Sequence, residues 1–459
     1  MKPPASDSAH SSNEGSKSTN KEVYDLDRAH VFHSWSAQGA ITPLPIAGGL
    51  GSYFWDFDGN RFLDFSSQLV FTNIGHQHPK VIAGIKKQAD LLATIAPQHA
   101  NETRSIAAQK IVAHAESHLN KVFFTNGGAD AVENAIRMAR IHTSRHKVLS
   151  HYRSYHGNTG AAISATGDPR RFPNEFAFGH VHFWGPYLYR SAFWANSEEQ
   201  ECVRALEHLE QTIIFEGPNT IAAILIESVI GTNGILVPPK GYLEGVRALC
   251  DKYGIMWIAD EVMAGFGRTG KWFAYQHSTA TPDLIVFAKG VNSGYIPLGG
   301  VIISDAIAAT FDQRVFPGGL TYSGHPIACA AAVAAIDAME EEGIIEHSLE
   351  IGEKVIGPAL HKLAEKHKLI GDIRGVGTFW GMDLVTDRAT RAPLAPYGGT
   401  SPAMGELVAA CKSRGLFPFV HFNRMHVVPP CTITADELHE GFAILDQAFT
   451  EVGKYYTGA

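Results

Sequence analysis

A lysine at the end of an apolar run is the residue of this chain best suited to covalent chemistry. The run Asp283-Leu-Ile-Val-Phe-Ala-Lys289 ends in an amine and is followed by the glycine-rich segment 290–300. Burial removes water from an ammonium group, which lowers its pKa and leaves a nucleophile that can form a Schiff base. A lysine at a strand end can instead extend its amine back to solvent, and this segment alone does not decide between the two roles.

Two further segments carry residue types that an aldehyde cofactor with a phosphate group needs. Asn126-Gly-Gly-Ala129 lies between an apolar run and a helical pattern. Free N–H groups at the start of that helix can hold a phosphate, and a tight turn that requires glycine is the alternative. Asp260-Glu261 ends another apolar run, where a carboxylate can pair with a ligand cation, bind a metal or cap a helix. A lysine, a carboxylate and a phosphate cup are together what pyridoxal phosphate requires.

The elements expected around these segments alternate between apolar strands and amphipathic helices. The strands are expected at 121–126, 147–151, 221–227, 255–260 and 283–289, and the helices at 101–118, 130–145 and 240–253. Strands that are apolar throughout and separated by helices predict a parallel or mixed sheet covered on both faces. Ligands bind beyond the carboxyl ends of the strands in such sheets, so the three segments should meet at one edge.

The chain is expected to divide into a large and a small domain after a polar tail. Residues 1–20 are small and polar and are expected to be disordered. Residues 21–77, with a hairpin that turns at Asp58-Gly59, are expected to join the small domain. The large cofactor-binding domain should span 78–330. An α+β segment at 331–459, entered through an alanine-rich helix at 326–341, should complete the small domain.

Composition favours a soluble, cytoplasmic protein that binds neither nucleic acid nor membrane. The formal charge is -8 without a long basic block. The five cysteines are widely spaced and form no CxxC pair, which is typical of reduced thiols. The chain contains neither an apolar run long enough to cross a bilayer nor the apolar stretch of a signal peptide. Its 23 histidines form no zinc-binding pattern, so no metal is expected.

A nucleotide-binding or scaffolding protein is the alternative from a different class. Gly265-Phe-Gly-Arg-Thr-Gly270 matches G-x-G-x-x-G, but it begins five residues after the preceding strand and no amphipathic helix follows it. The same stretch starts like a P-loop, yet Trp272 stands where a serine or threonine should hold magnesium. Both motifs therefore disfavour this alternative.

Beyond its tail, the chain closely resembles the class III (subgroup II) pyridoxal-phosphate aminotransferases of fold type I. The motifs that carry the resemblance are Trp55-Asp-x-x-Gly59, Asn73-Ile-Gly-His76, Phe124-Thr-Asn-Gly-Gly-Ala-Asp-Ala131, Tyr155-His-Gly157, Asp260-Glu-Val-x-x-Gly-Phe-Gly-Arg-Thr-Gly270, Phe287-Ala-Lys-Gly290 and Leu320-Thr-Tyr-Ser-Gly-His-Pro326. The resemblance implies an α/β fold with a large domain built on a mostly parallel sheet and a smaller α+β domain. It also implies a homodimer with shared active sites, with a tetramer as the alternative assembly.

The resemblance implies a role for each motif residue. The implied cofactor contacts are the N–H groups of Gly128 and Ala129 at the phosphate, Tyr155 and Val262 on the two ring faces, His156 and Glu227 close to the cofactor, and Asp260 at the pyridine nitrogen, with Lys289 carrying the aldimine. Thr321 would reach the phosphate of the neighbouring subunit, and a helix N-cap is the alternative for this residue.

Departures from the family pattern concern the phosphate cup and the substrate side of the site. The cup reads Gly127-Gly-Ala-Asp-Ala131 where the family often has Ser-Gly-Ser-Glu-Ala, so backbone donors must do more. Thr232 stands where γ-aminobutyrate-type members have a glutamate, and members that use pyruvate and ω-amines also lack this glutamate. Phe419 occupies the position of the usual carboxylate-binding arginine, and Arg424 is the nearest substitute. A solvated loop arginine is the alternative for Arg424. Val70 replaces a tryptophan, which should reshape the donor pocket.

The implied activity is a ping-pong transamination. The segment His33-Ser-Trp-Ser-Ala-Gln38, with Trp35, and the stretch Phe422-Asn-Arg424 are similar to those of taurine– or ω-amino acid–pyruvate aminotransferases. The expected donor is therefore a terminal amine with an anionic far end, such as taurine or β-alanine, and the expected acceptor is pyruvate. Transamination to 2-oxoglutarate, decarboxylation and intramolecular amino transfer on the same scaffold are the alternatives.

Overall fold

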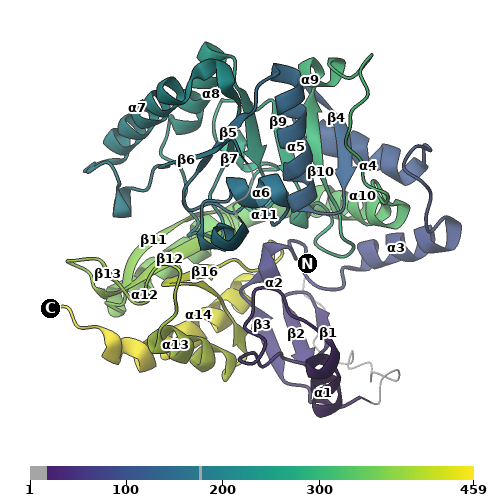
Figure 1. The fold of residues 1–459 in the computed structure, drawn as a ribbon. Helices are drawn as coiled ribbons and strands as arrows, with labels where there is room; N and C mark the ends of the chain where they lie inside the picture. Colours follow the sequence, from purple (N-terminus) through teal and green to yellow (C-terminus); the bar gives the residue numbers. More distant parts are fainter. Residues whose placement is uncertain (1–17, 175–177) are drawn as a thin grey trace.

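A seven-stranded sheet forms the centre of the computed structural model, which describes residues 18–174 and 178–459 (Figure 1). Its strands lie in the order β4 (Leu119–Thr125), β10 (Gly299–Ser304), β9 (Leu284–Phe287), β8 (Met256–Asp260), β7 (Ile221–Glu227), β5 (Lys147–His151) and β6 (His180–Phe183). The five strands from β9 to β6 are parallel, whereas β10 runs antiparallel to β4 and β9. The sequence prediction of a parallel or mixed sheet is confirmed, with the mixed form observed.

Helices cover both faces of this sheet because successive strand residues point to opposite sides. Leu225 of β7 packs in a cluster with α5 (Gly128–Thr143) and α6 (Gly160–Ala165). Its neighbours Ile224 and Ile226 pack on the other face, in a cluster with α4 (Glu102–Ala113), α7 (Glu198–Glu216), α8 (Tyr242–Tyr253) and α10 (Pro326–Glu341). All seven residues of β7 are buried, so this strand runs through the middle of the core.

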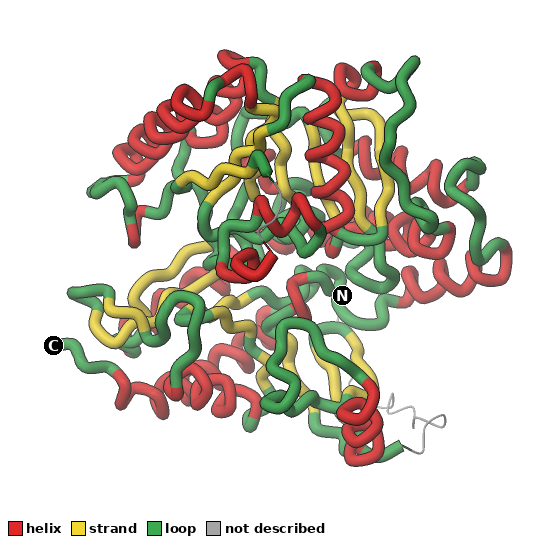
Figure 2. The backbone as a smooth tube through the Cα atoms, viewed as in Figure 1, coloured by secondary structure: helices red, strands yellow, loops and turns green. Residues whose placement is uncertain are grey.

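The N-terminal hairpin pairs with the C-terminal part of the chain, beside which it lies in Figures 1 and 2. Strands β1 (Ile46–Leu50), β2 (Tyr53–Asp56) and β3 (Arg61–Asp64) form a sheet that β14 (Leu416–Phe417) joins in parallel to β3. The expected turn at Asp58-Gly59 is present, with Gly59 at a φ of 84°. The segment 67–91 then leads to the large sheet through α2 (Ser67–Val70) and α3 (Pro79–Leu91).

A third sheet and four helices form the rest of the C-terminal part. The strands are β11 (Ile370–Val376), β12 (Phe379–Asp387), β16 (Arg424–Val427) and β15 (Phe419–His421), and β13 (Ala392–Pro393) pairs with β12. The helices are α11 (Ile344–Ile351), α12 (Gly357–Lys366), α13 (Pro402–Lys412) and α14 (Ala435–Val452). Their apolar faces share one core with Leu63 and Phe65. The division of the chain near residues 78 and 331 stays a prediction.

Two expected boundaries differ from the structure. Helix α1 (Asn20–His30) begins inside the expected tail because Thr19 and Glu22 form a capping box; residues 1–17 of that tail lie outside the described residues. The helix expected over 101–118 ends at Ala113 because the following residues turn into β4, with the Leu119 N–H donating to the Glu116 carbonyl.

The glycine-rich stretch Gly265–Gly270 serves close packing. Gly267 and Gly270 have φ angles of 88° and 80°, and a Cβ on them would lie 2.6 Å from Ile345 and 2.5 Å from Leu349 of α11. Between them, the buried Arg268 donates to Asn73 Oδ1 at 2.9 Å and to the Pro429 carbonyl. One side chain therefore ties the large sheet to segments from both ends of the chain.

Two expectations from composition can be compared with the structure. All five cysteines are buried free thiols, as predicted. None of the helices in residues 18–174 and 178–459 combines the length and apolarity needed to cross a membrane.

A candidate active site at the carboxyl edge of the sheet

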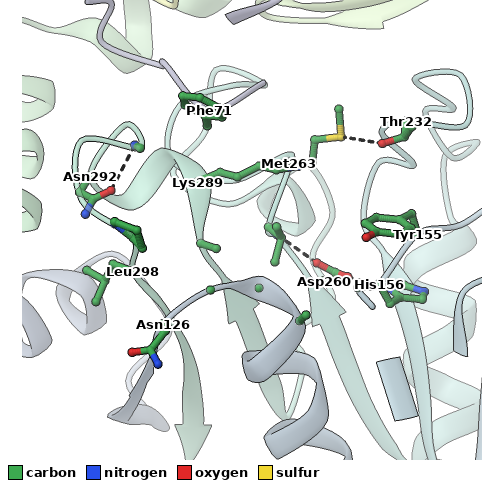
Figure 3. A pocket seen from close by; sticks show the side chains of 18 of the residues that line it. Phe71, Asn126, Tyr155, His156, Thr232, Asp260, Met263, Lys289, Asn292 and Leu298 are labelled. Carbon is green, nitrogen blue, oxygen red and sulfur yellow. Dashed lines mark hydrogen bonds and ion pairs between the residues drawn. The ribbon is translucent and has the colours of Figure 1, made fainter. Parts of the chain in front are cut away.

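The ends of three parallel strands bring the predicted acids and the lysine to one cavity. Glu227 and Asp260 lie opposite each other at the ends of β7 and β8, and Asp260 pairs in register with Val286 of β9. Lys289 follows two residues after β9 ends. The cavity has a volume of about 320 Å³, a size suited to a small molecule, and Figure 3 shows its lining. The sequence prediction that these segments meet at one edge is confirmed.

Lys289 was predicted at the end of the strand. It lies instead in a short turn beyond the strand. It opens a 3₁₀ turn (Lys289–Val291) with a φ of 42°, a left-handed conformation that a lysine adopts only at a cost of about 1–3 kcal/mol. Its side chain extends into the pocket (Figure 3). Burial lowers the pKa of the amine to about 8, although the charges of Asp260 and Glu227 act in the opposite direction. The amine is thus a nucleophile that is partly neutral near neutral pH.

The Asp260 carboxylate is fixed by two hydrogen bonds. Oδ2 lies 2.7 Å from His156 Nδ1, and Oδ1 accepts the Val262 N–H at 3.1 Å. The His156 backbone N–H in turn donates to Thr166 Oγ1 at 3.0 Å. Within residues 18–174 and 178–459, His156 Nε2 is buried without a partner. The histidine therefore serves the carboxylate alone and holds it facing the cavity (Figure 3).

Glu227 ties its strand to the loop that carries Tyr155. Its two carboxylate oxygens accept the Tyr155 N–H at 3.0 Å and the Gly231 N–H at 2.7 Å. Burial raises the pKa of Glu227 to about 7, the His156 ring lowers it, and the nearby Asp260 charge raises it further. Glu227 lines the cavity and orders the loop on its far wall.

The start of α5 forms a cradle of backbone donors. Helix α5 begins at Gly128, and no side chain caps it. A Cβ on Gly128 would lie 3.0 Å from both methyl groups of Val262. Gly157, at a φ of 131°, contacts Ala129 so closely that a Cβ would lie 2.6 Å from the Ala129 Cβ. Glycine at both positions keeps these approaches free of side-chain crowding, and the uncapped start of α5 offers backbone N–H groups of the kind that bind phosphate.

Tyr155 and Val262 both line the cavity, as expected. The Trp35 ring meets Tyr155 edge-on with a centroid distance of 6.4 Å and remains 64% exposed. Arg170 places its guanidinium carbon 3.7 Å from the Tyr155 ring centroid. Arg170 was not among the predicted site residues, because it follows Tyr155 by 15 residues and belongs to no motif.

Five predicted residues lie outside the cavity wall, and Trp35, which contacts Tyr155, is one of them. Val70 is fully buried in an apolar cluster, and Phe419 packs against that cluster and the His426 ring. Arg424 is 2% exposed behind the wall, so the alternative of a solvated loop arginine is wrong. Thr321 is exposed in the loop before α10, whose N-cap is His325, so the N-cap alternative for Thr321 is also wrong.

Several wall residues were not predicted. Among them are Phe71, Met263, Asn292 and Leu298, all labelled in Figure 3. Most lie inside or next to motifs quoted above, at positions where the motif itself gave no reason to choose them. Thr232, which was predicted as a departure, also lines the cavity, with its Oγ1 3.6 Å from Met263 Sδ.

Comparisons with known proteins agree on one family. The model of the aminotransferase class-III family matches residues 35–449. A taurine–pyruvate aminotransferase of Bilophila wadsworthia is 32% identical, over 94% of this chain and 97% of its own length. The solved taurine:2-oxoglutarate aminotransferase of Bifidobacterium kashiwanohense, in complex with PLP and glutamate, is 44% identical, with a TM-score of 0.93 over 96% of this chain and 100% of that one. A thermostable (S)-enantioselective ω-transaminase of Thermomicrobium roseum is 33% identical, with a TM-score of 0.89 over 95% and 100%.

Proposed function

The chain belongs to the class III aminotransferases, and from that premise we propose that it moves the amino group of a terminal amine with an acidic far end to a keto acid. The observation that carries this proposal is the shared cavity of the Lys289 amine and the Asp260–His156 pair. Because the chain belongs to this family, the alternative hypothesis of a non-catalytic nucleotide-binding protein is rejected. Class III aminotransferases use pyridoxal phosphate, which when bound withdraws electrons from the carbon that loses a proton.

The residues around the cavity fit this cofactor. The open N–H groups of Gly128 and Ala129 would hold the phosphate, in a cradle that a side chain would fill. Asp260 would keep a proton on the pyridine nitrogen, since His156 fixes the carboxylate toward the cavity. Val262 and Tyr155 would cover the two ring faces, and Glu227 would hold the Tyr155 loop in place.

Lys289 would both bind the cofactor and move a proton. An amine with a pKa near 8 is a nucleophile and, once released, a base within the same cavity. Its Nζ would take the proton from the donor carbon and return it to the cofactor carbon. Asp260 would stay directed at the pyridine nitrogen, because two hydrogen bonds fix its carboxylate.

The donor proposal rests on the relatives and on the chain's own charges. Taurine appears in the names of the Bilophila and Bifidobacterium proteins, and an ω-amino acid in that of a 34% identical 5-aminovalerate aminotransferase of Pseudomonas aeruginosa. Arg170 places a positive charge against the Tyr155 ring of the cavity wall, which favours donors with an anionic far end over plain amines.

Two acceptors are supported by different observations. Thr232 in place of the switch glutamate and the 32% identical Bilophila relative favour pyruvate. The solved Bifidobacterium structure at 44% identity favours 2-oxoglutarate. Either keto acid would receive the donor's amino group and become the corresponding amino acid, with the same residues moving the protons.

A homodimer with shared sites is part of the proposal. Thr321 and Tyr322 are exposed in the loop before α10, which leaves them accessible to a second copy. Thr321 would then contact the phosphate in the cavity of that copy.

The experiment is a panel of donors against the two acceptors with purified, cofactor-loaded protein. Taurine or β-alanine with one keto acid should yield alanine or glutamate, and Lys289→Ala should yield neither. Loss of carbon dioxide, or an isomerised amine formed without any keto acid, would instead indicate a decarboxylase or an aminomutase. Absence of amino acid product with every donor would refute the proposal.

A further inference from the structure

Three arginines gather beside Tyr155 on the substrate side of the site; Arg153, Arg170 and Arg424 are called the distal arginines below. Arg170 contacts the Tyr155 ring, which lines the cavity. Arg153 and Arg424 place their guanidinium carbons 5.9 and 5.7 Å from the Tyr397 ring centroid. These charges come from the loop after β5, the 3₁₀ segment Pro169–Asn174 and β16, so only the fold brings them together.

The Arg170 guanidinium is held by Asp168 through two of its nitrogens, which leaves Nη1 able to bind a ligand. Its backbone N–H and Nε donate to Asp168 at 2.9 and 3.0–3.1 Å, and its Nη2 donates to the same carboxylate. Asp168 is fully buried and also accepts Asn233 Nδ2 at 3.1 Å. Arg170 Nη1 makes no hydrogen bond within the described residues, and the side chain is 26% exposed. A guanidinium fixed in this way can receive a planar or tetrahedral oxyanion without further loss of side-chain freedom.

Arg424 is buried without a carboxylate of its own. It is 2% exposed, and its Nε and Nη1 are buried without a hydrogen-bond partner among residues 18–174 and 178–459. The nearest acid, Asp383, lies 4.0 Å away and already binds Arg190 and Arg374 at 3.0 and 2.8 Å. A buried cation that lacks its own anion is costly, so an anionic ligand near it would be stabilised.

The positive charge extends to the reacting end of the cavity. The charges of Arg170 and Arg424 both act on His421, whose pKa burial lowers to about 4, so this ring is neutral and adds no opposing charge. The Arg170 charge also acts on Lys289. Asp168 is the one carboxylate that pairs directly with a distal arginine at less than 4 Å within residues 18–174 and 178–459.

We propose that Arg170, with Arg153 and Arg424 behind it, is a specificity-determining residue that receives the acidic group at the far end of the substrate. The inference rests on the proposed function and names the chemistry of the donor's far end, an oxyanion carried as sulfonate or carboxylate. The sequence predicted that Arg424 contacts the acidic group of the substrate. We assign this contact to Arg170 instead, because Arg170 contacts the cavity wall and Arg424 is enclosed.

A purely structural role for Arg170 is the rival explanation. Arg170→Gln alone would leave the buried Asp168 without its partner and could unfold the loop. The double variant Asp168→Asn with Arg170→Gln removes both charges and keeps a polar side chain at each position. Arg170→Lys keeps the charge and tests rescue. Arg171→Gln is the matched control, since Arg171 follows directly and donates to the Gly167 carbonyl at 3.2 Å.

The test compares matched donors on the cofactor-loaded protein. β-Alanine and β-alaninamide differ in the charge of the far end, and taurine supplies the sulfonate. The first half-reaction is run without keto acid, and the change in the cofactor's absorbance measures its rate. For the double variant, the ratio of kcat/KM for β-alanine to that for β-alaninamide should fall about 10–100-fold, mostly through KM, as expected for a lost hydrogen bond to a charged group. The Arg171→Gln ratio should stay at the wild-type value. Equal losses for acid and amide would show a structural role and overturn the proposal.

Binding of amine-free acids separates this inference from the proposed function. Ethanesulfonate and propionate cannot react, and calorimetry measures their affinity for the loaded protein directly. Weaker binding to the double variant, with partial recovery in Arg170→Lys, supports the anion subsite even if the wild type uses neither taurine nor β-alanine. Equal binding to wild type and double variant, or no binding to either, would overturn it. The preference between the two acids identifies the sulfonate or the carboxylate as the natural group.

Discussion

The Asp260 carboxylate and the His156 imidazole form a buried pair, with 2.7 Å between Oδ2 and Nδ1. Asp260 ends β8, whereas His156 belongs to the loop after β5, two strands away in the sheet. The orientation of the acid is therefore set from outside its own strand. A change at His156 should therefore act on the chemistry through Asp260.

Replacing His156 should lower activity through Asp260. We expect His156→Ala to reduce kcat about 10–100-fold, the usual effect of removing a partner that orients a functional group. His156→Asn keeps a donor close to the Nδ1 position and should recover part of the loss. Steady-state kinetics together with the cofactor content per subunit make the comparison. Full activity in His156→Ala would show that Asp260 needs no such support.

Lys289→Ala should abolish transamination and the visible absorbance of the cofactor joined to the protein. The loss should reach at least about 10³-fold, because both the covalent attachment and the proton transfer depend on this amine. Lys271→Ala is the control, since Lys271 is exposed. An absorption spectrum and a single-turnover assay suffice, and a retained visible band in Lys289→Ala would contradict the assignment.

The pH dependence of cofactor uptake should report the lowered pKa of Lys289. Only the neutral amine attacks an aldehyde, so with a pKa of about 8 the reactive fraction is about a tenth at pH 7 and about nine tenths at pH 9. The rate at which the apoprotein takes up pyridoxal phosphate should rise about tenfold over this interval and then level off. A lysine at the ordinary 10.5 would show a rate still rising above pH 10. Stopped-flow absorbance distinguishes the two curves.

Gly157→Ala should weaken cofactor binding. The glycine has a φ of 131°, and the added Cβ would lie 2.6 Å from Ala129, so the cradle must open or the loop must shift. Backbone strain of about 1–3 kcal/mol corresponds to an increase in Kd for pyridoxal phosphate of about 10–100-fold. Gly160→Ala is the matched control, since its Cβ meets nothing within 4 Å. Titration of the apoproteins should leave the control unchanged, and an unchanged Kd in Gly157→Ala would contradict the proposed cup.

The sequence predicts the centre of the site better than its substrate side, for physical reasons. Glu227 and Asp260 end strands whose apolar runs are legible in the sequence, and parallel pairing then forces them together. Arg170 belongs to a 3₁₀ segment whose sequence has no periodicity. It lies against Tyr155 only because α6 brings the chain back to that ring, so no local sequence pattern predicts the contact. The enclosure of Arg424 depends on Tyr397, which comes from another segment, and burial of that kind is decided by packing.

The antiparallel pairing of β9 with β10 has a consequence for how Lys289 is supported. Strands β9 and β10 are antiparallel neighbours, so residues 288–298 form a hairpin connection whose two ends are both anchored in the core. Its backbone can detach only if two buried strands separate, and its amide protons should therefore exchange with solvent as slowly as those of the strands themselves. The lysine can thus exchange one covalent partner for another while its main chain stays still, and its mobility is confined to four methylene groups and a nitrogen.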